Sequence, residues 1–314
     1  MRYRQLGTSG LTVSVVGLGC NNFGGRLDLD ASRPVVDAAL DAGITLLDTS
    51  NTYGNRGGSE TILGELLEGR RDEVVLATKW GMDMGEGDGV ARGSRRYVRM
   101  AVEASLRRLR TDRIDLYQLH RPDPLTPVAE TLAALDELVK EGKVRYVGSS
   151  NFSAWQVADA DWTARSAGTE RFISAQNHYS LLERAAEREL LPACERFGVG
   201  VLPFFPLANG LLTGKHRRGE LAEGSRMAGR DVPERTWDTV EALTAFAEQR
   251  GHSILELAIG GLLASPVVGS VIAGATRPEQ VRANVAAGEW ELSADDRAAL
   301  AELLAGRRAG AGRG

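Results

Sequence analysis

Short runs of aliphatic and β-branched residues alternate with longer amphipathic segments along almost the whole chain. The short runs have the length of strands, and the longer segments repeat apolar residues every three or four positions, as helices with one buried face do. No Pro-rich or Ser-rich linker interrupts this alternation before the final AGRRAGAGRG. The pattern predicts a single domain over residues 1–314, with a flexible tail over about 305–314.

The first apolar runs predict a hairpin, since Tyr3–Leu6 and Thr12–Val16 flank the turn residues Gly7-Thr8-Ser9-Gly10. Eight further strands are expected after it. They lie near Gly17 and at Ile44–Leu47, Val74–Thr78, Leu116–Leu119, Tyr146–Ser149, Ile173–Gln176, Gly200–Phe204 and Gly269–Ile272.

Helices are expected between these strands. One begins at Ser32, which precedes Arg33-Pro34 and places a proline in the first turn. The others are Thr61–Leu67 after Ser59-Glu60, Tyr97–Leu109 after Ser94, a helix from Thr126-Pro127 to Lys140, Trp155–Ala164, Ala186–Phe197, two around Thr236–Ala264, and Pro278–Ala286. This repetition favours a (β/α)8 TIM barrel with an N-terminal β-hairpin, and a doubly wound open sheet is the alternative.

Composition narrows the class of protein further. Of the 314 residues 43% are hydrophobic and 25% are charged, close to the averages of globular domains. The net charge is −4 and no block of Lys or Arg occurs, which argues against nucleic acid as a partner. No apolar stretch approaches the roughly 18 residues of a membrane span. Cys20 and Cys194 form no CxxC pair, so we expect a cytoplasmic protein; the oligomeric state is not indicated.

Several well-known motifs are broken in this chain. Gly17-Leu18-Gly19 begins a dinucleotide fingerprint that Asn22 interrupts, and Gly214-Lys215 lacks the first glycine of a phosphate-binding loop because Asn209 stands there. The four histidines form no HxH or HExxH pattern, so no metal site is predicted. A GxSxG serine hydrolase motif is also absent.

Polar residues instead gather where the predicted strands end. Asp48, Lys79, His120, Ser150-Asn151 and Gln176-Asn177 each lie at the end of a predicted strand or directly after it. In barrels of this kind the active site lies at the carboxyl ends of the strands. These residues are therefore expected to meet in one site.

The segments around them closely resemble the aldo/keto reductase family. The matching segments follow the family's order from residue 1 to about 290, and they read DTSNTYGNRGGSE, LATKWG, DLYQLHRPDP, GKVRYVGSSNFS, QNHYSLLER, GLLTGK and VIAGATRPEQVRANV. The resemblance implies a barrel that binds NADPH and reduces an aldehyde or ketone to the alcohol. It also implies that Tyr53 is the acid, that Asp48 and Lys79 tune it, and that His120 orients the substrate carbonyl.

Physical chemistry supports these roles. Hydride transfer to a carbonyl builds negative charge on oxygen, which a positioned proton donor relieves. An unperturbed phenol has a pKa near 10. The Lys79 cation makes Tyr53 a better acid, and Asp48 keeps a buried lysine charged. Each residue alone also fits a turn, a surface charge or a core histidine, but their joint placement at four strand ends favours the site.

By the same resemblance, Ser150, Asn151 and Gln176 bind the nicotinamide carboxamide, and Phe204 stacks on its ring. Phe205 stands where the family commonly has a serine, so a hydroxyl for the pyrophosphate is missing. Backbone N–H groups of the following turn are the expected replacement. The remaining predicted cofactor residues are Pro206, Leu207, Gly210 and Leu212 in that turn, Gly274, Thr276 and Arg277 for the 2′-phosphate, and Gln280 and Asn284 for the adenine.

Two other functions stay open at this point. Channel β subunits share this fold and these motifs, so a cofactor-sensing regulatory subunit with little turnover is one alternative. The other is a metal-dependent isomerase or an aldolase in which Lys79 forms a Schiff base. Trp80 suggests an apolar wall for the substrate, but the loops do not say which carbonyl compound is bound.

Overall fold

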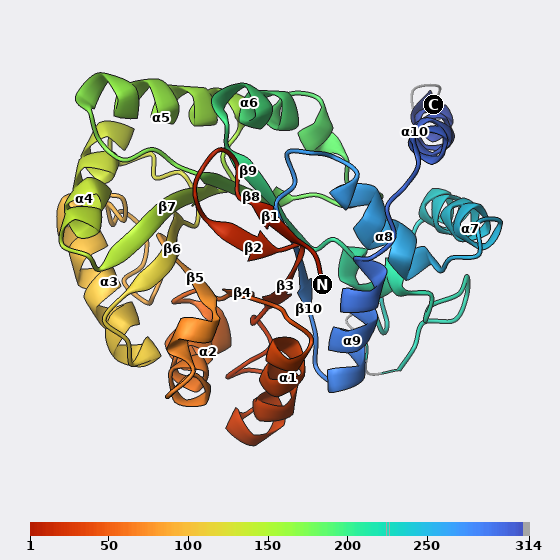
Figure 1. Cartoon of the computed structure of the whole chain (residues 1–314), viewed down its shortest axis with the longest axis horizontal. Coiled ribbons are helices and arrows are strands. Elements are labelled where there is room, and N and C mark those ends of the chain that lie inside the picture. Colours follow the sequence, from red (N-terminus) through yellow and green to blue (C-terminus); the bar gives the residue numbers. More distant parts are fainter. Residues whose placement is uncertain (224, 226, 310–314) are drawn as a thin grey trace.

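Eight parallel strands around a common axis form the centre of the computed structural model, which describes residues 1–223, 225 and 227–309 (Figure 1). Neighbouring strands follow the order β10-β3-β4-β5-β6-β7-β8-β9. Val201 N donates to Val267 O at 2.8 Å, and Gly269 N donates to Val201 O at 3.0 Å, so β9 also meets the segment that leads into β10. The predicted (β/α)8 barrel is thus confirmed.

The strands are short, and an antiparallel hairpin of β1 and β2 precedes the barrel as predicted. Their bounds are β1 Tyr3–Gln5, β2 Thr12–Ser14, β3 Val16–Gly19, β4 Leu46–Asp48, β5 Val75–Trp80, β6 Ile114–Leu119, β7 Val144–Ser150, β8 Ser174–His178, β9 Gly200–Phe204 and β10 Val271–Gly274.

Helices surround the barrel, and α7 and α10 lie outside this ring beside α8 (Figure 1). The α-helices are α1 Leu29–Asp41, α2 Tyr53–Leu66, α3 Arg95–Leu109, α4 Val128–Lys140, α5 Ala154–Ala167, α6 Leu190–Phe197, α7 Glu234–Glu248, α8 Ile254–Leu263, α9 Pro278–Ala287 and α10 Ala294–Ala309. Three short 3-10 turns are η1 Arg71–Glu73, η2 Ala185–Glu187 and η3 Ala208–Thr213.

The hairpin closes the amino-terminal end of the barrel. Leu6 and Val13 are fully buried and pack with a small cluster inside the barrel that includes Leu46, Leu116 and Ile272. Figure 1 shows β1 and β2 crossing the barrel opening in this view. With this end filled by apolar side chains, the opposite end is left for a site.

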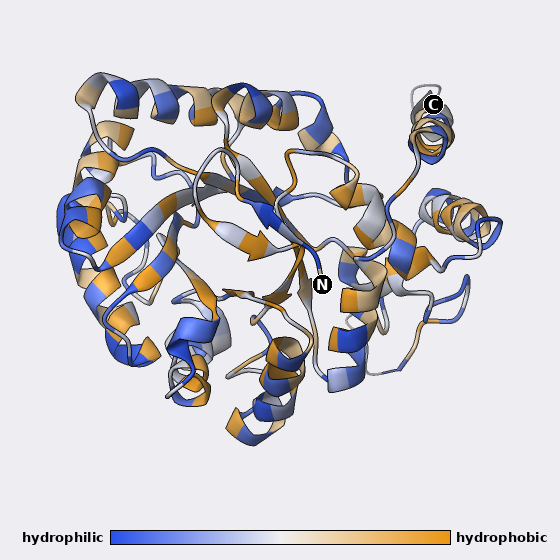
Figure 2. Cartoon of the chain, in the orientation of Figure 1, coloured by the Kyte–Doolittle hydropathy of each residue, from blue (hydrophilic) through white to orange (hydrophobic). Residues whose placement is uncertain are grey.

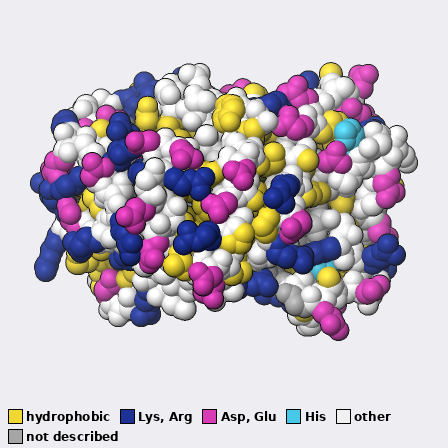
Figure 3. Space-filling model, turned by 60° about the horizontal axis from the view of Figure 1, so that its bottom comes forward, with side chains coloured by type: hydrophobic (Ala, Val, Ile, Leu, Met, Phe, Trp, Pro, Cys, Tyr) yellow, Lys and Arg dark blue, Asp and Glu magenta, His cyan; other side chains and the backbone are white. Residues whose placement is uncertain are grey.

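A larger apolar cluster lies between the strands and the helices. Hydrophobic and hydrophilic residues alternate along the outer helices in Figure 2, as expected for helices with one buried face. On the side of the molecule in Figure 3, Lys, Arg, Asp and Glu side chains are interspersed. Among the described residues, no helix has the length and apolarity needed to cross a bilayer.

Some predicted helix bounds are wrong. Helix α1 begins at Leu29 rather than at Ser32, because Asp28 is the N-cap and its side chain accepts a hydrogen bond from Ala31 N at 2.9 Å. Pro34 therefore lies inside the helix. Helix α6 begins at Leu190, after the separate turn η2.

The C-terminal helix α10 was not predicted at all. It extends to Ala309 and so covers part of the range 305–314 for which the sequence predicts a flexible tail. Residues 310–314 of that range lie outside the described residues.

Candidate active site

The polar residues singled out in the sequence lie at the carboxyl ends of consecutive strands. Asp48 ends β4, Lys79 is the next-to-last residue of β5, and His120 directly follows β6. Ser150 ends β7, and Gln176 lies within β8. The parallel register aligns these ends, so the barrel brings together residues from five strands at one rim.

A buried ion pair forms the floor of this site. Lys79 Nζ lies 2.7 Å from Asp48 Oδ2 and donates to Thr49 O at 2.8 Å. Lys79 is 0% exposed and Asp48 is 3% exposed. Burial alone would lower the pKa of Lys79, but Asp48 and Tyr53 raise it above its ordinary value. The amine is therefore held as a cation.

Tyr53 lies above this pair, with its ring centroid 5.0 Å from Lys79 Nζ. Burial raises the pKa of the Tyr53 phenol, and the Lys79 charge opposes that shift without cancelling it. The Tyr53 phenol is thus protonated at neutral pH. If it loses its proton, the Lys79 ammonium lies close enough to stabilise the phenolate. A phenol with a cation beside it can serve as a proton donor.

The backbone around Tyr53 takes an unusual path. Gly54, Asn55 and Arg56 have φ values of 63°, 58° and 67°, and a regular helix follows only after Gly57, close to the predicted start at Ser59-Glu60. A Cβ on Gly54 would lie 2.4 Å from Phe23 O, so a side chain does not fit there. Left-handed segments of this kind are costly and persist only where the surrounding structure holds them.

Buried charges fasten this turn to the barrel. Glu60 of α2 is fully buried and accepts hydrogen bonds from Arg108 Nε at 2.7 Å and from Thr78 Oγ1 at 2.6 Å. The Arg108 side chain also fills the space where a Cβ on Gly57 would lie, at 2.6 Å. Helix α2, which begins with Tyr53, is thereby tied to β5, which carries Lys79.

His120 completes the predicted catalytic set. Its ring meets the Tyr53 ring edge-on, with centroids 5.8 Å apart at 82°. His120 N donates to Trp80 O at 2.7 Å, which fixes its backbone. Burial, with the Lys79 and Arg121 charges, lowers the pKa of His120 to about 3. The imidazole is neutral at ordinary pH.

The three residues expected to bind a carboxamide form a hydrogen-bonded cluster. Ser150 Oγ donates to Gln176 O at 2.9 Å, and Asn151 Nδ2 donates to His120 O at 2.9 Å. Gln176 Nε2 donates to Asp48 Oδ1 at 2.8 Å. The amide donors of Asn151 and Gln176 are thus used within the protein, and their oxygens are the groups suited to an amide N–H of a ligand.

Phe204 ends β9 and belongs to an aromatic cluster. His178 stacks on it with centroids 5.5 Å apart at 10°, and Phe205 meets it edge-on at 5.3 Å and 78°. Phe205 has a φ of 52° and is 39% exposed. The ring of Phe204 is therefore held in one orientation by its neighbours.

The turn η3 differs from expectation in its hydrogen bonds. Gly210 N and Leu212 N both donate to Leu207 O, at 2.8 and 3.2 Å, so these N–H groups are not free for a phosphate. Pro206 precedes this turn and lacks an N–H group. Because the turn is a tight 3-10 helix, the N–H groups that the sequence suggested for the pyrophosphate are bonded within the turn itself.

Other groups beside this turn fit an anionic ligand. His216 is 4% exposed, its Nδ1 accepts from Ala222 N at 3.1 Å, and its buried Nε2 has no hydrogen-bond partner among the described residues. A Cβ on Gly210 would lie 3.2 Å from Lys215 Nζ and 3.3 Å from His216 Nε2. A buried imidazole donor and an ammonium thus converge on the glycine, which suits a dinucleotide pyrophosphate.

The start of α9 holds the last group of predicted cofactor residues. Thr276 N and Thr276 Oγ1 donate to Gln280 Oε1 at 2.8 and 3.2 Å, which closes the turn after Gly274. Arg277 is the exposed N-cap residue, so its guanidinium is accessible at the helix N-terminus. Asn284 is buried on the same helix.

Two further residues at this rim contact the predicted catalytic residues, although neither is among the site residues predicted from the sequence. Gln118 Nε2 lies 3.4 Å from Asp48 Oδ1, and Ser50 Oγ lies 3.1 Å from His120 Nδ1. Gln118 lies in β6 two positions before His120, which directly follows the strand, so the alternation of strand side chains could have indicated it. Trp80, expected as a wall for the substrate, is instead fully buried and stacks on Tyr117 at 4.3 Å.

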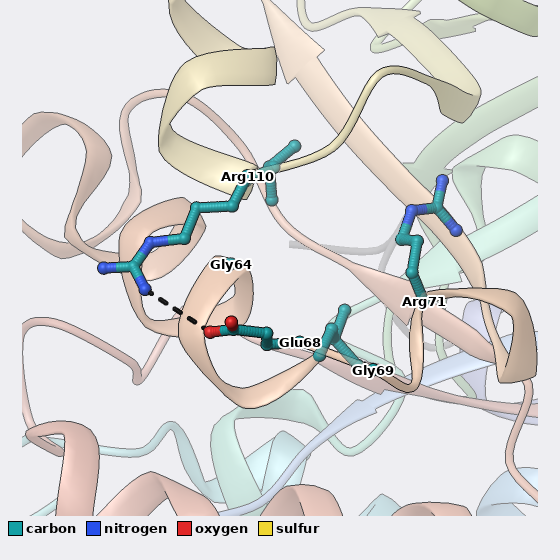
Figure 4. Close-up of a pocket in the computed structure, with 7 residues that line it drawn as sticks. Gly64, Glu68, Gly69, Arg71 and Arg110 are labelled. Atoms are coloured by element: carbon teal, nitrogen blue, oxygen red, sulfur yellow. Dashed lines mark ion pairs between the residues drawn. The ribbon is translucent and has the colours of Figure 1, made fainter.

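A pocket of about 250 Å³ lies elsewhere, where α2 and α3 end near the amino-terminal side of the barrel (Figure 4). Its charged groups already have partners. Arg110 pairs with Glu65 at 3.3 Å and with Glu68 at 3.8 Å, and Arg71 pairs with Asp115 at 2.7 Å. We therefore assign the chemistry to the opposite rim. The described residues also contain no cluster of three or more His, Cys, Asp or Glu suited to a metal ion.

Fold and site together are those of an aldo/keto reductase. Residues 15–305 match the model of the Aldo/keto reductase family, and the chain belongs to that family. It is 38% identical to YrpG, an uncharacterized oxidoreductase of Bacillus subtilis, over 98% of this chain and 97% of that protein. It is 36% identical to L-glyceraldehyde 3-phosphate reductase of Escherichia coli, over 91% and 87% of the two chains.

The relatives are not all named as enzymes. A probable voltage-gated potassium channel subunit beta of rice is 35% identical, over 91% of each chain. The family match and the oxidoreductase relatives nevertheless place this chain among oxidoreductases.

Proposed function

We propose that this protein is an NADPH-dependent reductase that converts an aldehyde or ketone to the alcohol, with Tyr53 as the proton donor. The observation that carries the proposal is the fully buried Lys79 cation, paired with Asp48 at 2.7 Å and lying against the Tyr53 ring. Burying an ion pair costs free energy, and apolar residues at the same positions would stabilise the core at least as well. A protonated phenol beside such a cation is suited to proton transfer.

Each side chain then has a defined task. Tyr53 donates its phenolic proton to the carbonyl oxygen as negative charge develops there. Lys79 stabilises the phenolate that is left, and Asp48 holds Lys79 in place. His120, being neutral, donates a hydrogen bond to the same oxygen and orients the substrate. The phenolate regains a proton from solvent after the alcohol leaves.

The residues around the rim fit a nicotinamide dinucleotide. Ser150, Asn151 and Gln176 would hold its carboxamide, and Phe204 would support the ring. His216 and Lys215 would meet the pyrophosphate beside Gly210. When bound, the reduced cofactor supplies the hydride for the carbonyl carbon. The exposed Arg277 at the start of α9 favours a 2′-phosphate, and hence NADPH over NADH.

A regulatory subunit is the second candidate, because potassium channel β subunits are among the relatives. Such a protein would bind the same cofactor and turn over little substrate. We favour the reductase, since all four catalytic residues are present and in contact range. We also propose that the chain acts as one domain in the cytoplasm.

The test is to titrate the purified protein with NADPH and NADH by fluorescence, and then to follow oxidation of the preferred cofactor with a panel of aldehydes and ketones. The panel includes L-glyceraldehyde 3-phosphate, the compound in the name of the E. coli relative. We expect tighter binding of NADPH and turnover of at least one carbonyl. Binding without turnover of any member would favour the regulatory subunit, and absence of binding would overturn both.

A further inference from the structure

His120 needs one particular tautomer for its proposed task. A neutral imidazole carries a proton on only one ring nitrogen, so the other nitrogen is an acceptor. Only the tautomer with the proton on Nε2 leaves Nδ1 as the acceptor and makes Nε2 a donor. Because the pKa of His120 is lowered to about 3, the ring is not doubly protonated at ordinary pH, and only one of its two nitrogens carries a proton.

The group that faces Nδ1 is a serine hydroxyl. Ser50 Oγ lies 3.1 Å from His120 Nδ1, although the two residues are 70 positions apart in the chain. Ser50 is 0% exposed, so water does not compete for this contact. It stands between the β4 strand that ends at Asp48 and the turn that begins at Tyr53.

Few groups around Ser50 Oγ can take its proton, and His120 Nδ1 is one of them. Thr52 N donates to Ser50 Oγ at 3.3 Å, and Thr52 Oγ1 lies 3.0 Å away as a second possible donor. When Thr52 Oγ1 is the donor of that pair, both lone pairs of Ser50 Oγ are filled and the one serine proton is left for another acceptor, whereas in the opposite sense Thr52 Oγ1 itself takes that proton. Asn51 Oδ1 competes for that proton at 3.5 Å, which is longer than the 3.1 Å to His120 Nδ1.

The ring of His120 is also fixed in place. Its backbone N–H is bonded to Trp80 O at 2.7 Å, its carbonyl accepts from Asn151 Nδ2 at 2.9 Å, and its ring lies edge-on to Tyr53. With Nδ1 against Ser50, the remaining nitrogen Nε2 is the one available to a ligand. The hydrogen bond between Ser50 and Nδ1 thus decides whether Nε2 is a donor or an acceptor toward that ligand.

We infer that Ser50 is a positioning residue, which donates its hydroxyl proton to His120 Nδ1 and so fixes the tautomer with the proton on Nε2. This assigns Ser50 a part in orienting the substrate, and that consequence rests on the proposed function. The tautomer itself does not depend on turnover, so it can be measured on the protein alone.

The experiment is ¹⁵N NMR of the protein labelled at histidine, since a protonated and an unprotonated ring nitrogen give clearly different shifts. Comparison with His120→Gln assigns the signals of His120 among the four histidines. Ser50→Ala removes the donor, and Ser50→Cys keeps a weak donor of similar shape. Ser32→Ala is the matched control, because Ser32 is equally buried but bonds to Asp28 O at 2.6 Å on α1.

In the wild-type protein and in Ser32→Ala, we expect His120 to carry its proton on Nε2. Ser50→Ala should show a mixture of tautomers, and Ser50→Cys should fall between. A wild-type proton on Nδ1, or an unchanged tautomer in a folded Ser50→Ala protein, would overturn the inference. If Ser50→Ala does not fold, the Ser50→Cys and wild-type spectra decide.

Kinetics then test the consequence separately. With a carbonyl substrate from the panel, Ser50→Ala should lower kcat/KM about tenfold, the effect of losing a neutral hydrogen bond that selects one tautomer. Ser32→Ala should keep the wild-type value. A tautomer shift without any fall in kcat/KM would remove Ser50 from substrate orientation, whereas a wild-type protein that reduces no carbonyl would contradict the proposed function and leave the tautomer result standing.

Discussion

Gln176 Nε2 donates to Asp48 Oδ1 at 2.8 Å, across 128 positions of sequence. The other oxygen of the same carboxylate, Oδ2, pairs with Lys79 at 2.7 Å. One carboxylate therefore joins a residue expected to bind the cofactor to the ion pair beneath Tyr53, the proposed proton donor. Asp48 is shared between the two halves of the site, which couples them physically.

From this contact we predict that Gln176→Leu weakens NADPH binding about tenfold and also lowers kcat, because it removes a hydrogen bond to a buried charge. Gln118→Leu is the comparison, since Gln118 reaches the same oxygen at the longer distance of 3.4 Å. Fluorescence titration and initial rates measure both effects. Equal losses of NADPH affinity in the two variants would show that Gln176 has no special role in cofactor binding.

Tyr53→Phe should lower kcat for carbonyl reduction by at least about a hundredfold, since general acid catalysis commonly contributes that much. The ring and its packing against His120 are retained, so NADPH affinity should stay within about twofold of wild type. Steady-state rates and a parallel titration separate the two quantities. A variant with near-wild-type kcat would remove Tyr53 as the proton donor.

Arg277→Ala should weaken binding of NADPH about tenfold and leave binding of NADH nearly unchanged, because in the proposed complex the guanidinium pairs with the additional phosphate. Arg282→Ala is the matched control, as Arg282 is an exposed arginine on the same helix α9. Both affinities follow from the same fluorescence titration. If NADPH and NADH lose affinity equally, Arg277 does not contact the 2′-phosphate.

The sequence predicts the rim of the site well because polar residues directly follow apolar strand segments, and a closed parallel barrel brings such positions together. Asp48, Lys79 and His120 are found in this way. The Ser50 contact with His120 could not be predicted, since serine is common in loops and its partner lies on another strand. The register of the sheet and the path of the turn at Tyr53 decide that contact.

Errors in the secondary structure have local causes. Helix α10 begins at a side-chain cap, in which Asp296 N donates to Ser293 Oγ at 3.0 Å and Ser293 Oγ donates to Asp296 Oδ2 at 2.7 Å. At α1, the sequence predicts a start at Ser32, whereas the Asp28 side chain accepts from Ala31 N at 2.9 Å and starts the helix one turn earlier. The internal hydrogen bonds of η3 depend on tertiary geometry that single-sequence patterns do not encode.

Protonation of His120 should reduce stability in mild acid. Its pKa is about 3 in the folded protein and 6.5 in the unfolded chain, so the unfolded state binds the proton more readily. The contribution of His120 to the free energy of unfolding is complete above pH 6.5. It is lost as the pH falls from 6.5 toward 3, by about 1.4 kcal/mol for each pH unit.

Urea unfolding at pH 7.5 and pH 5 measures this loss. Between these pH values, wild type should lose about 2 kcal/mol more than His120→Gln, in which the titrating group is absent. The comparison cancels other groups that titrate in the same range. Identical losses in the two proteins would mean that His120 is not held in its neutral form by the fold.

Arg108→Ala should lower the free energy of unfolding by about 3 kcal/mol, because it leaves the carboxylate of Glu60 buried without its counter-charge. We expect this loss of stability to be accompanied by a lower kcat. Glu60 ties α2, which begins at Tyr53, to Thr78 on β5, so a looser α2 should also reduce kcat. Urea unfolding and initial rates are the measurements.

Two variants isolate the charge from the packing. Arg107→Ala removes the exposed neighbouring arginine and should change stability by less than about 0.5 kcal/mol. Arg108→Met keeps an apolar stem against Gly57 but no charge, so it should remain destabilised if the ion pair with Glu60 is what matters. Should Arg108→Met match wild type in both stability and kcat, packing at Gly57 and not the buried ion pair holds Tyr53 over Lys79.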